Sequence, residues 1–437
     1  MSYDARIQAA ESDPQQLEQL FQVARRSEQV GDFRAAVQAL HEATPENVLL
    51  TAWVYRLQSL AEETGKPKRS INWGAAVPLS ILTGLVFWAI GSESFTIRGD
   101  VPQLFLWWSP IAAFSALIFM AVTAKRGTTR ALALGLSLLA AAAYAVLLTP
   151  AFREDWASDQ YLILAAIHIP LLCWVALGVH TLGFRSSVAD RFAFLIKSLE
   201  VLIVAGLYLG AGVAFGGITV GMFAALGITL PEILARLIMA GGFGLLPVLA
   251  LATIYDPRVA PAMQDFEQGL SKFIATMMRL LLPLTLVVLT IYVLVIPFNF
   301  FAPFGDRELL MVYNVMLFAI IALLMGATPI TGAELSPELQ KVLRFGLLLV
   351  AGLAVLVSVY ALSAVVYRTF QGVLTPNRLT VIGWNGINIG ILLAVLVTQV
   401  RKGREGWIET LHTVFSRATN AYAVWGLFLI VALPILF

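Results

Sequence analysis

The chain has very little cysteine, histidine and charge. Cys173 is its one cysteine, which excludes an internal disulfide and any metal site built from several cysteines. The four histidines, His41, His168, His180 and His412, are scattered and show no paired spacing typical of metal ligands. Charged residues make up 13% of the 437 residues, about half the share of a typical soluble domain. Walker-type phosphate loops and the Gly-x-Ser-x-Gly sequence of hydrolases are also absent, so we predict no enzyme, cofactor or metal centre.

Apolar residues make up most of what is there. They account for 59% of the chain, and the mean hydropathy is +0.82. Apolar runs of about 20 residues recur from residue 73 onward, and each is long enough to cross a ~30 Å hydrocarbon core as a helix. The net charge of +2 gives no sign of nucleic acid binding. The predicted fold class is therefore all-α, a polytopic bundle of transmembrane helices whose first partner is the lipid bilayer.

Eleven spans are expected, and the Lys and Arg residues between them predict their orientation. The spans are residues 73–91, 102–123, 131–150, 161–182, 194–215, 232–254, 280–298, 309–328, 345–366, 379–399 and 418–436. Loops before the odd-numbered spans carry about three times as many Lys and Arg as the loops after them. Cytoplasmic loops carry such an excess, so the N-terminus is predicted inside and the C-terminus outside.

Residues 1–70 are predicted to be a separate cytoplasmic segment before the transmembrane domain of residues 71–437, because they are polar and contain no signal peptide. Apolar residues repeat at helical spacing on three faces, around Leu17, Phe33 and Trp53. The sequence GDFRAAVQALHEATPEN resembles the second helix of a tetratricopeptide repeat, although Pro45 comes about three residues early. The resemblance implies a docking arm for a cytoplasmic protein partner. A helical hairpin that only covers the bundle is the alternative.

One apolar stretch, FGGITVGMFAALGITLPEILAR at residues 215–236, is interrupted by helix-weakening residues. These are Gly216, Gly217, Gly221, Gly227 and Pro231. Counting residues 216–230 as a full crossing would invert every later loop, so we expect a short re-entrant or interfacial half-helix there. Transporters place substrate at such breaks, whereas the same glycines also permit tight helix packing alone.

Ionisable residues at membrane depth are costly, so each is a candidate for function. The candidates are Glu232, Arg236, Lys197, Glu200 and His168. Glu232 and Arg236 are four residues apart and predicted to pair, and Lys197 and Glu200 share a helix face at the inner end of the fifth span. His168 lies in mid-span, where an imidazole either relays protons or donates a hydrogen bond across helices. The side-chain amides of Asn314, Asn385 and Asn388 are also expected to form hydrogen bonds between helices.

Three amphipathic stretches are predicted to form short helices in the inner membrane interface, each before a span. They are MQDFEQGLSKFIATMM at 263–278, SPELQKVLRF at 336–345 and EGWIETLHTVF at 405–415. Ser336 has the position of an N-cap, followed by Pro337 at the first helical position.

A late stretch, VVYRTFQGVLTPNRLTVIGWNGINI at residues 365–389, resembles the signature of an uncharacterised family of bacterial inner-membrane proteins. Members tend to read Tyr-Gly-Leu-Thr-x-x-Arg before a late span. Gly372, Thr375 and Arg378 fit this signature, whereas Val373 is an insertion and the Tyr is displaced. The resemblance covers roughly residues 190–400. It implies a membrane fold in the bacterial cytoplasmic membrane and no activity.

Two functions stay open on this sequence. One is permease- or flippase-like transport of a small or lipid-like substrate near residues 215–236. The other is a membrane-anchored scaffold or regulator that works through residues 1–70. The residues identify neither the substrate nor the partner, and they leave the oligomeric state open.

Overall fold

The computed structural model describes residues 3–27, 29–65, 70–92, 94–97, 101–148, 152, 155–266, 269–305, 307–402 and 405–437. They belong to two compact units, Met1–Ser70 and Ile71–Phe437, which are treated separately. Nearly all elements are helices, and the described strands are one short antiparallel pair, β1 (Thr96–Ile97) and β2 (Val101–Pro102). The predicted all-α class is confirmed.

The N-terminal unit contains four helices: α1 (Tyr3–Gln8), α2 (Pro14–Arg26), α3 (Val30–Ala43) and α4 (Val48–Gly65). The three predicted helical faces lie on α2, α3 and α4 and meet in one core. Its centre is the aromatic trio Phe21, Phe33 and Trp53, with ring centroids 5.4 to 5.7 Å apart. The sequence did not predict α1, because its six residues are too few to show a period; Ile7 nevertheless fixes it in this core.

In the membrane unit, each predicted span coincides with a helix. The helices are α5 (Trp73–Ile90), α6 (Leu104–Ala124), α7 (Thr128–Leu148), α8 (Asp155–Leu182), α9 (Val188–Ala225), α10 (Glu232–Arg236) with the π-helix η2 (Leu237–Gly241) and α11 (Gly242–Ile254), α12 (Gly269–Val295), α14 (Arg307–Ala327), α15 (Pro337–Gln371), α16 (Pro376–Lys402) and α17 (Trp407–Leu436). Among the described residues, ten helices are long and apolar enough to cross a membrane. The apolar part of α14, Val312–Ala327, is shorter. The chain is thus a multi-pass membrane protein.

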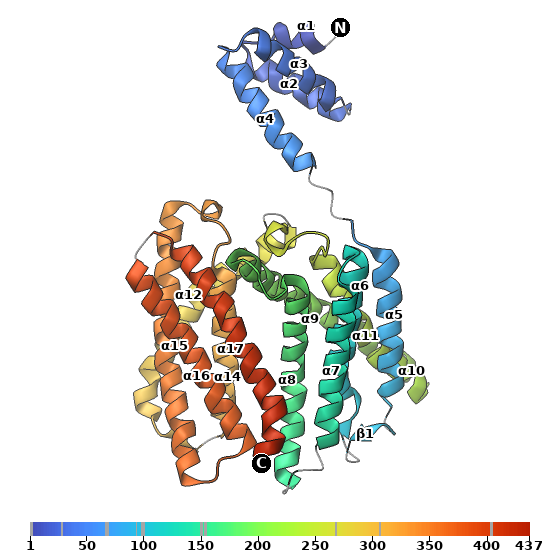
Figure 1. The fold of residues 1–437 in the computed structure, drawn as a ribbon, viewed down its shortest axis with the longest axis vertical. Helices are drawn as coiled ribbons and strands as arrows, with labels where there is room; N and C mark the ends of the chain where they lie inside the picture. The colour runs from blue at the N-terminus through green and yellow to red at the C-terminus, as the bar shows by residue number, and fades with distance from the viewer. Residues whose placement is uncertain are drawn as a thin grey trace. The chain divides into compact units, whose positions relative to one another are not determined.

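The ends of the helices fall at two opposite ends of this unit. Figure 1 shows the ends of α6, α8 and α16 and the start of α15 at one end, with the C-terminus at the other. The loops rich in Lys and Arg therefore share one end of the bundle, as alternating crossings require. Which end faces the cytoplasm stays a prediction.

The two largest clusters of buried residues in this unit both include residues of α17. One cluster lies among α9, α12, α14, α15, α16 and α17, and the other among α6, α7, α8, α16 and α17 (Figure 1). Helices α5 and α11 share a smaller apolar cluster with α6, and their crossing also depends on glycine. A Cβ added at Gly244 would lie 2.6 Å from the Cα of Gly84, so only glycine permits this approach of the two backbones.

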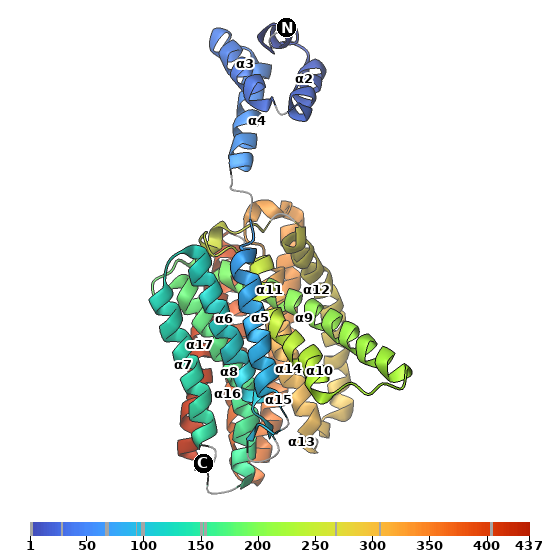
Figure 2. The ribbon, with the colours of Figure 1, turned by 90° about the vertical axis from the view of Figure 1, so that its right-hand side faces the viewer.

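The predicted half-helix at residues 216–230 is wrong in one respect. Helix α9 continues through Gly216, Gly217 and Gly221 to Ala225, and it stops only before Gly227, which has φ of +72°. A glycine inside a helix costs about 1 kcal/mol relative to alanine. Breaking the helix in lipid would leave several backbone groups without hydrogen bonds, which costs more. Figure 2 shows the C-terminal part of α9 extending to the side of the bundle before the chain returns through α10.

The three predicted interfacial helices are also not separate elements. Residues 269–278, 337–345 and 407–415 form the first turns of α12, α15 and α17, which run on without a break into the spans, whereas residues 263–266 precede α12. No helix-breaking sequence separates the amphipathic turns from the apolar ones, so one continuous helix satisfies the backbone groups between them. Ser336 does cap α15, since its side chain accepts a hydrogen bond from the N–H of Leu339 at 3.4 Å.

Candidate functional site

The predicted Glu232–Arg236 pair is present at the start of the sixth span. Arg236 Nη1 lies 3.2 Å from Glu232 Oε1, and the guanidinium carbon lies 5.7 Å from the ring centroid of Trp88 on α5. The Trp88 indole in turn donates to the carbonyl of Ile233 at 3.1 Å, which fixes α10 against α5. The Arg236 side chain is 17% exposed and that of Glu232 is 61% exposed, so the pair is unequally shielded.

The helix changes its form directly after Arg236. Residues Leu237–Gly241 form a π-helical turn between α10 and α11. Arg236 Nε is buried beside this turn and has no hydrogen-bond partner among the described residues. A π-turn is less stable than an α-turn and occurs often at functional sites. Arg236 thus combines a shielded charge, an unused donor and an irregular helix.

Lys197 and Glu200 form a closed cluster instead. Lys197 Nζ donates to Glu200 Oε2 at 2.8 Å, to the carbonyl of Asp265 at 2.6 Å and to Ser271 Oγ at 2.9 Å. Ser271 Oγ also donates to Glu200 Oε2 at 2.8 Å, and the ring centroid of Phe266 lies 4.3 Å from the ammonium nitrogen. All three ammonium donors have acceptors. The geometry therefore favours the anchoring interpretation, with α9 tied to α12 and to the loop before it.

His168 also has both ring nitrogens engaged. The Trp384 indole on α16 donates to His168 Nε2 at 2.8 Å, and Nδ1 lies 2.6 Å from the carbonyl of Leu164. An indole N–H can only donate, so Nε2 accepts and the proton is on Nδ1. Protonation of Nε2 would break the bond to Trp384. The structure thus matches the inter-helix hydrogen bond and gives the proton relay no support.

The three asparagines make contacts between helices as predicted. Asn385 Nδ2 on α16 donates to Asn314 Oδ1 on α14 at 2.7 Å, and the Tyr422 hydroxyl on α17 donates to Asn388 Oδ1 at 2.7 Å. These amides join three helices in the apolar interior. Hydrogen bonds of this kind orient helices where burial of apolar surface gives no driving force.

The signature residues Gly372, Thr375 and Arg378 do come together. Thr375 Oγ1 accepts from the backbone N–H of Arg378 at 3.3 Å, and the Arg378 guanidinium donates to the carbonyl of Val373 at 2.6 Å. A Cβ at Gly372 would lie 2.8 Å from Arg378 Nη1. These contacts all lie within the turn between α15 and α16 and stabilise it, so the role of the three residues here is structural.

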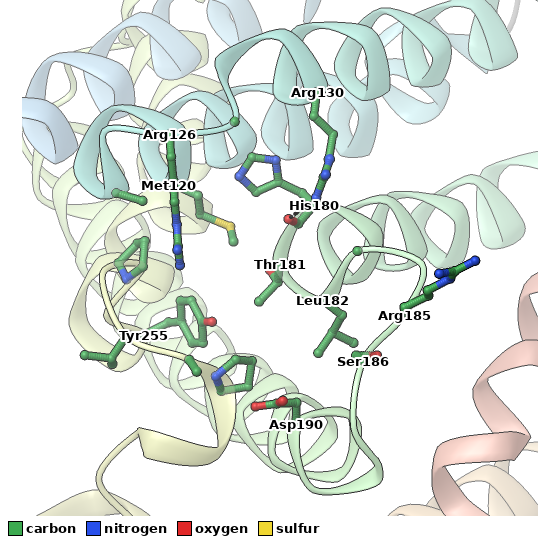
Figure 3. A pocket seen from close by; sticks show the side chains of 17 residues that line it. Met120, Arg126, Arg130, His180, Thr181, Leu182, Arg185, Ser186, Asp190 and Tyr255 are labelled. Atoms are coloured by element: carbon green, nitrogen blue, oxygen red, sulfur yellow. Dashed lines mark hydrogen bonds between the residues drawn. The ribbon is translucent and has the colours of Figure 1, made fainter.

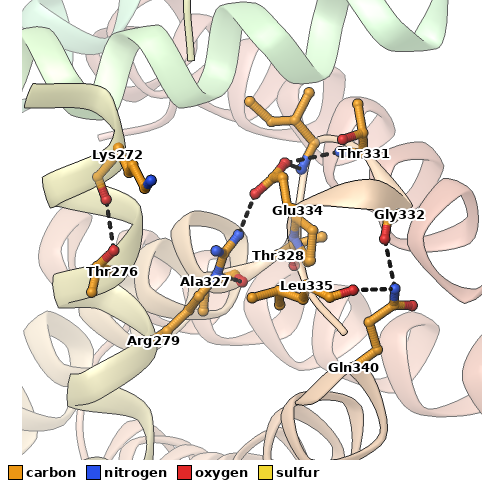
Figure 4. A network of polar contacts seen from close by, with 12 residues as sticks. Lys272, Thr276, Arg279, Ala327, Thr328, Thr331, Gly332, Glu334, Leu335 and Gln340 are labelled. Atoms are coloured by element: carbon orange, nitrogen blue, oxygen red, sulfur yellow. Dashed lines mark hydrogen bonds and ion pairs between the residues drawn. The ribbon is translucent and has the colours of Figure 1, made fainter. Parts of the chain in front are cut away.

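Sequence reasoning missed another ion pair, partly buried, which is shown in Figure 4. Arg279 Nη2 on α12 lies 2.6 Å from Glu334 Oε2, and Arg279 Nε donates to the carbonyl of Ala327 at 3.2 Å. Glu334 Oε1 accepts from the N–H groups of Ile330 and Thr331. The partners are 55 residues apart, so no local spacing signals this pair. Arg279 and Glu334 both bind backbone groups of the turn between α14 and α15, so this pair stabilises the turn.

The candidates do not form one site. Lys197 and Glu200, His168, and Glu232 with Arg236 are each held by different helices, and of these only Arg236 keeps an unused donor in the described part of the chain. No family model, curated protein or solved structure matches this chain. The resemblance of residues 190–400 to a bacterial membrane family accordingly stays a prediction.

Proposed function

We propose that this integral membrane protein is a permease of the flippase type, which moves a lipid-like substrate across the bacterial cytoplasmic membrane. The observation that carries the proposal is Arg236, whose Nε is buried and unpartnered beside a π-helical turn. A buried donor without an acceptor is costly, so an acceptor on a substrate would stabilise it. A phosphate or carboxylate in a lipid head group supplies such an acceptor.

The surroundings of Arg236 suit a substrate with apolar chains. The last turns of α9 pack beside η2, where a Cβ at Gly216 would lie 3.1 Å from the Met239 sulfur. The same turns expose Phe215, Ile218 and Met222 at 71%, 64% and 65%. Acyl chains lying along this face would bring a polar head group to the shielded guanidinium. A lipid-like substrate therefore fits better than a small hydrophilic one.

The π-turn supplies a physical means of movement. The hydrogen bonds of a π-helical turn span one residue more than those of an α-helical turn, and such turns occur often at functional sites. A change of Leu237–Gly241 to α-helix would rotate Arg236 relative to α11 and carry a bound head group with it. The close approach of Gly84 and Gly244 places α11 against α5 directly after this turn.

Lipid movement in proteoliposomes tests the proposal. Fluorescent phosphatidylglycerol in both leaflets is bleached from outside with dithionite, and the inner-leaflet fraction that becomes bleached is followed. We expect wild-type protein to expose this fraction and Arg236→Gln to slow it about tenfold, because one charged hydrogen bond to substrate is lost. Glu232→Gln is the matched control and keeps most of the rate. Wild-type vesicles that bleach no more than protein-free vesicles would remove the proposal.

A membrane-anchored scaffold or regulator is the second candidate, and one observation favours it. Residues 1–70 form a compact unit with its own core. Val48 and Tyr55 lie two turns apart on one face of α4 and are 81% and 69% exposed. An apolar helix of a cytoplasmic protein would bind such a face.

Truncation separates the two candidates. A chain that begins at Glu62 keeps the basic residues Lys66, Lys68 and Arg69 before the first span, so we expect it to insert in the same orientation. A transporter of this design keeps its rate of lipid movement after the truncation. If the protein is a scaffold, neither the full-length nor the truncated chain moves lipid. Removal of residues 1–61 then abolishes the cellular function of the protein.

A further inference from the structure

A cavity of about 350 Å³ opens where α6, α8 and α11 end, at the end of the bundle that carries the basic loops. Its lining contains Arg126, Arg130, Arg185 and His180, with Asp190 as the one carboxylate. Figure 3 shows Arg126 pointing into the cavity toward Tyr255 and Arg130 lying beside His180, whereas Arg185 points away. Two arginines from one helix connection thus converge on one space.

The positive charge of this cavity is not neutralised from within. In the part of the chain that the structure describes, no ion pair involves Arg126 or Arg130. The one side-chain hydrogen bond of Arg130 is a long one, 3.5 Å from Nη1 to the carbonyl of His180. Asp190 brings one negative charge against the three arginines of the lining, and its carboxylate accepts from two neutral donors, Ser187 Oγ at 2.8 Å and the N–H of Ala262 at 3.1 Å. The two arginines therefore have unused donors.

His180 adds a further unused group. Its Nδ1 is buried and has no hydrogen-bond partner among the described residues. The turn between α6 and α7 lies on this imidazole, since a Cβ at Gly127 would be 3.2 Å from His180 Cε1 and Gly127 has φ of +75°. Only glycine adopts that conformation without strain, and it brings Arg126 and Arg130 to the same side. On the far wall, burial raises the pKa of Tyr255, so its hydroxyl stays a neutral donor.

We propose that this cavity binds a phosphate group. Guanidinium groups bind phosphate in a planar, often bidentate geometry, and two of them with an imidazole and a phenol offer donors on several sides. The volume is at the lower end for a ligand pocket and suits a head group or a small phosphate ester. Basic pockets at helix ends bind anionic lipid head groups, but a soluble phosphate has the same chemistry. The site does not depend on the proposed transport, since a protein that moves nothing can hold such a ligand.

Ligand-dependent thermal stability of the purified full-length protein tests this site. Three probes are added separately in mild detergent: dioleoyl phosphatidylglycerol, dioleoylglycerol with the same chains but no phosphate, and glycerol 3-phosphate. We expect phosphatidylglycerol to raise the melting temperature and dioleoylglycerol to leave it unchanged. A rise with glycerol 3-phosphate as well identifies a site for soluble phosphates, and a rise with the lipid alone identifies a head-group site.

Variants locate the binding. The double variant Arg126→Gln with Arg130→Gln should bind phosphate more weakly, because two charged donors are lost. We expect the half-saturating concentration of the phosphate ligand to rise about tenfold or more. Arg126→Lys keeps the positive charge but lacks the planar guanidinium group, so its half-saturating concentration should lie between those of the wild type and the double variant. Arg185→Gln, which lines the cavity but points away, is the matched control and keeps the wild-type response. Equal shifts with phosphatidylglycerol and dioleoylglycerol, no shift with any phosphate, or an unchanged response in the double variant would each overturn the proposal.

Discussion

Two charge pairs of almost equal spacing have opposite surroundings in this molecule. The side chains of Lys197 and Glu200 are 4% and 2% exposed, and those of Arg236 and Glu232 are 17% and 61% exposed. In the first pair every ammonium donor has an acceptor, whereas in the second Arg236 Nε has none. A buried ion pair that is fully satisfied fixes helices in place. In an ion pair with an unused donor, a ligand can still form a hydrogen bond. The comparison therefore identifies Lys197 with Glu200 as a structural anchor and Arg236 as a candidate binding site.

The largest expected effect concerns the side of the membrane on which each pair lies. Phe184 precedes α9 and is 84% exposed, and Ile228 follows it and is 48% exposed. With the predicted orientation, cysteine in place of Ile228 reacts with a membrane-impermeant maleimide in intact cells. Cysteine in place of Phe184 reacts only after permeabilisation, against a background kept low because the native Cys173 is buried. The reverse pattern would invert the predicted topology.

The next largest effect is the loss of Lys197. Lys197→Ala leaves Glu200 buried without its partner, which we expect to destabilise the membrane unit by about 3–5 kcal/mol. The double change Lys197→Met with Glu200→Met removes both charges and should recover much of that loss. Melting temperatures in detergent and the yield of extracted protein measure both. Equal stability of the single variant and the wild type would mean that the cluster is hydrated.

The corresponding change in the second pair should be small. Glu232 is largely exposed, so Arg236→Ala leaves a solvated carboxylate and lowers stability by only about 0.5–1 kcal/mol. The double change Glu232→Ala with Arg236→Ala should then melt within error of the single one. A single variant that is clearly less stable than the double one would show that the pair is buried like the first.

The smallest effect belongs to a third pair, in the N-terminal unit. A hydrogen bond from Arg56 lowers the pKa of Glu18 below its ordinary value of 4.5. The folded state therefore prefers the carboxylate, so this stabilisation is present above pH of about 4.5 and is lost as the pH falls through the folded value. Both side chains are more than a third exposed, so the effect is at most about 0.5 kcal/mol. Acid titration of residues 1–65 should show it, and Glu18→Gln should remove it.

Sequence predicted the spans well because their signal is local. The length of each apolar run can be read directly from the sequence, and each of the eleven predicted spans follows from one run. It predicted Glu232 with Arg236 for the same reason, since both residues lie on one turn of helix. Gly216, Gly217 and Gly221 were misread as a break, because a helix in lipid continues through weak residues when stopping would leave backbone groups unpaired.

The partners of the charges could not be predicted. Ser271 reaches Lys197 from 74 residues away, and the spacing of Lys197 and Glu200 alone does not distinguish an anchor from a site. The π-turn after Arg236 has no signature in composition. Arg126 and Arg130 could be interpreted from the sequence only as signals of orientation, because His180, which lines the same cavity, comes 50 residues after Arg130.

The most direct measurement of the central claim, that Arg236 and not Lys197 is open to a lipid-like ligand, is photo-crosslinking. A phosphatidylglycerol with a diazirine near its head group is irradiated with the protein in vesicles, and the labelled peptides are mapped by mass spectrometry. We predict label within Glu232–Gly241 that falls about tenfold in Arg236→Gln, because the head group loses its charged donor, and no label at Lys197 or Glu200. Label at Glu232–Gly241 that is equal in wild type and variant, or label on the Lys197 cluster, would contradict the account.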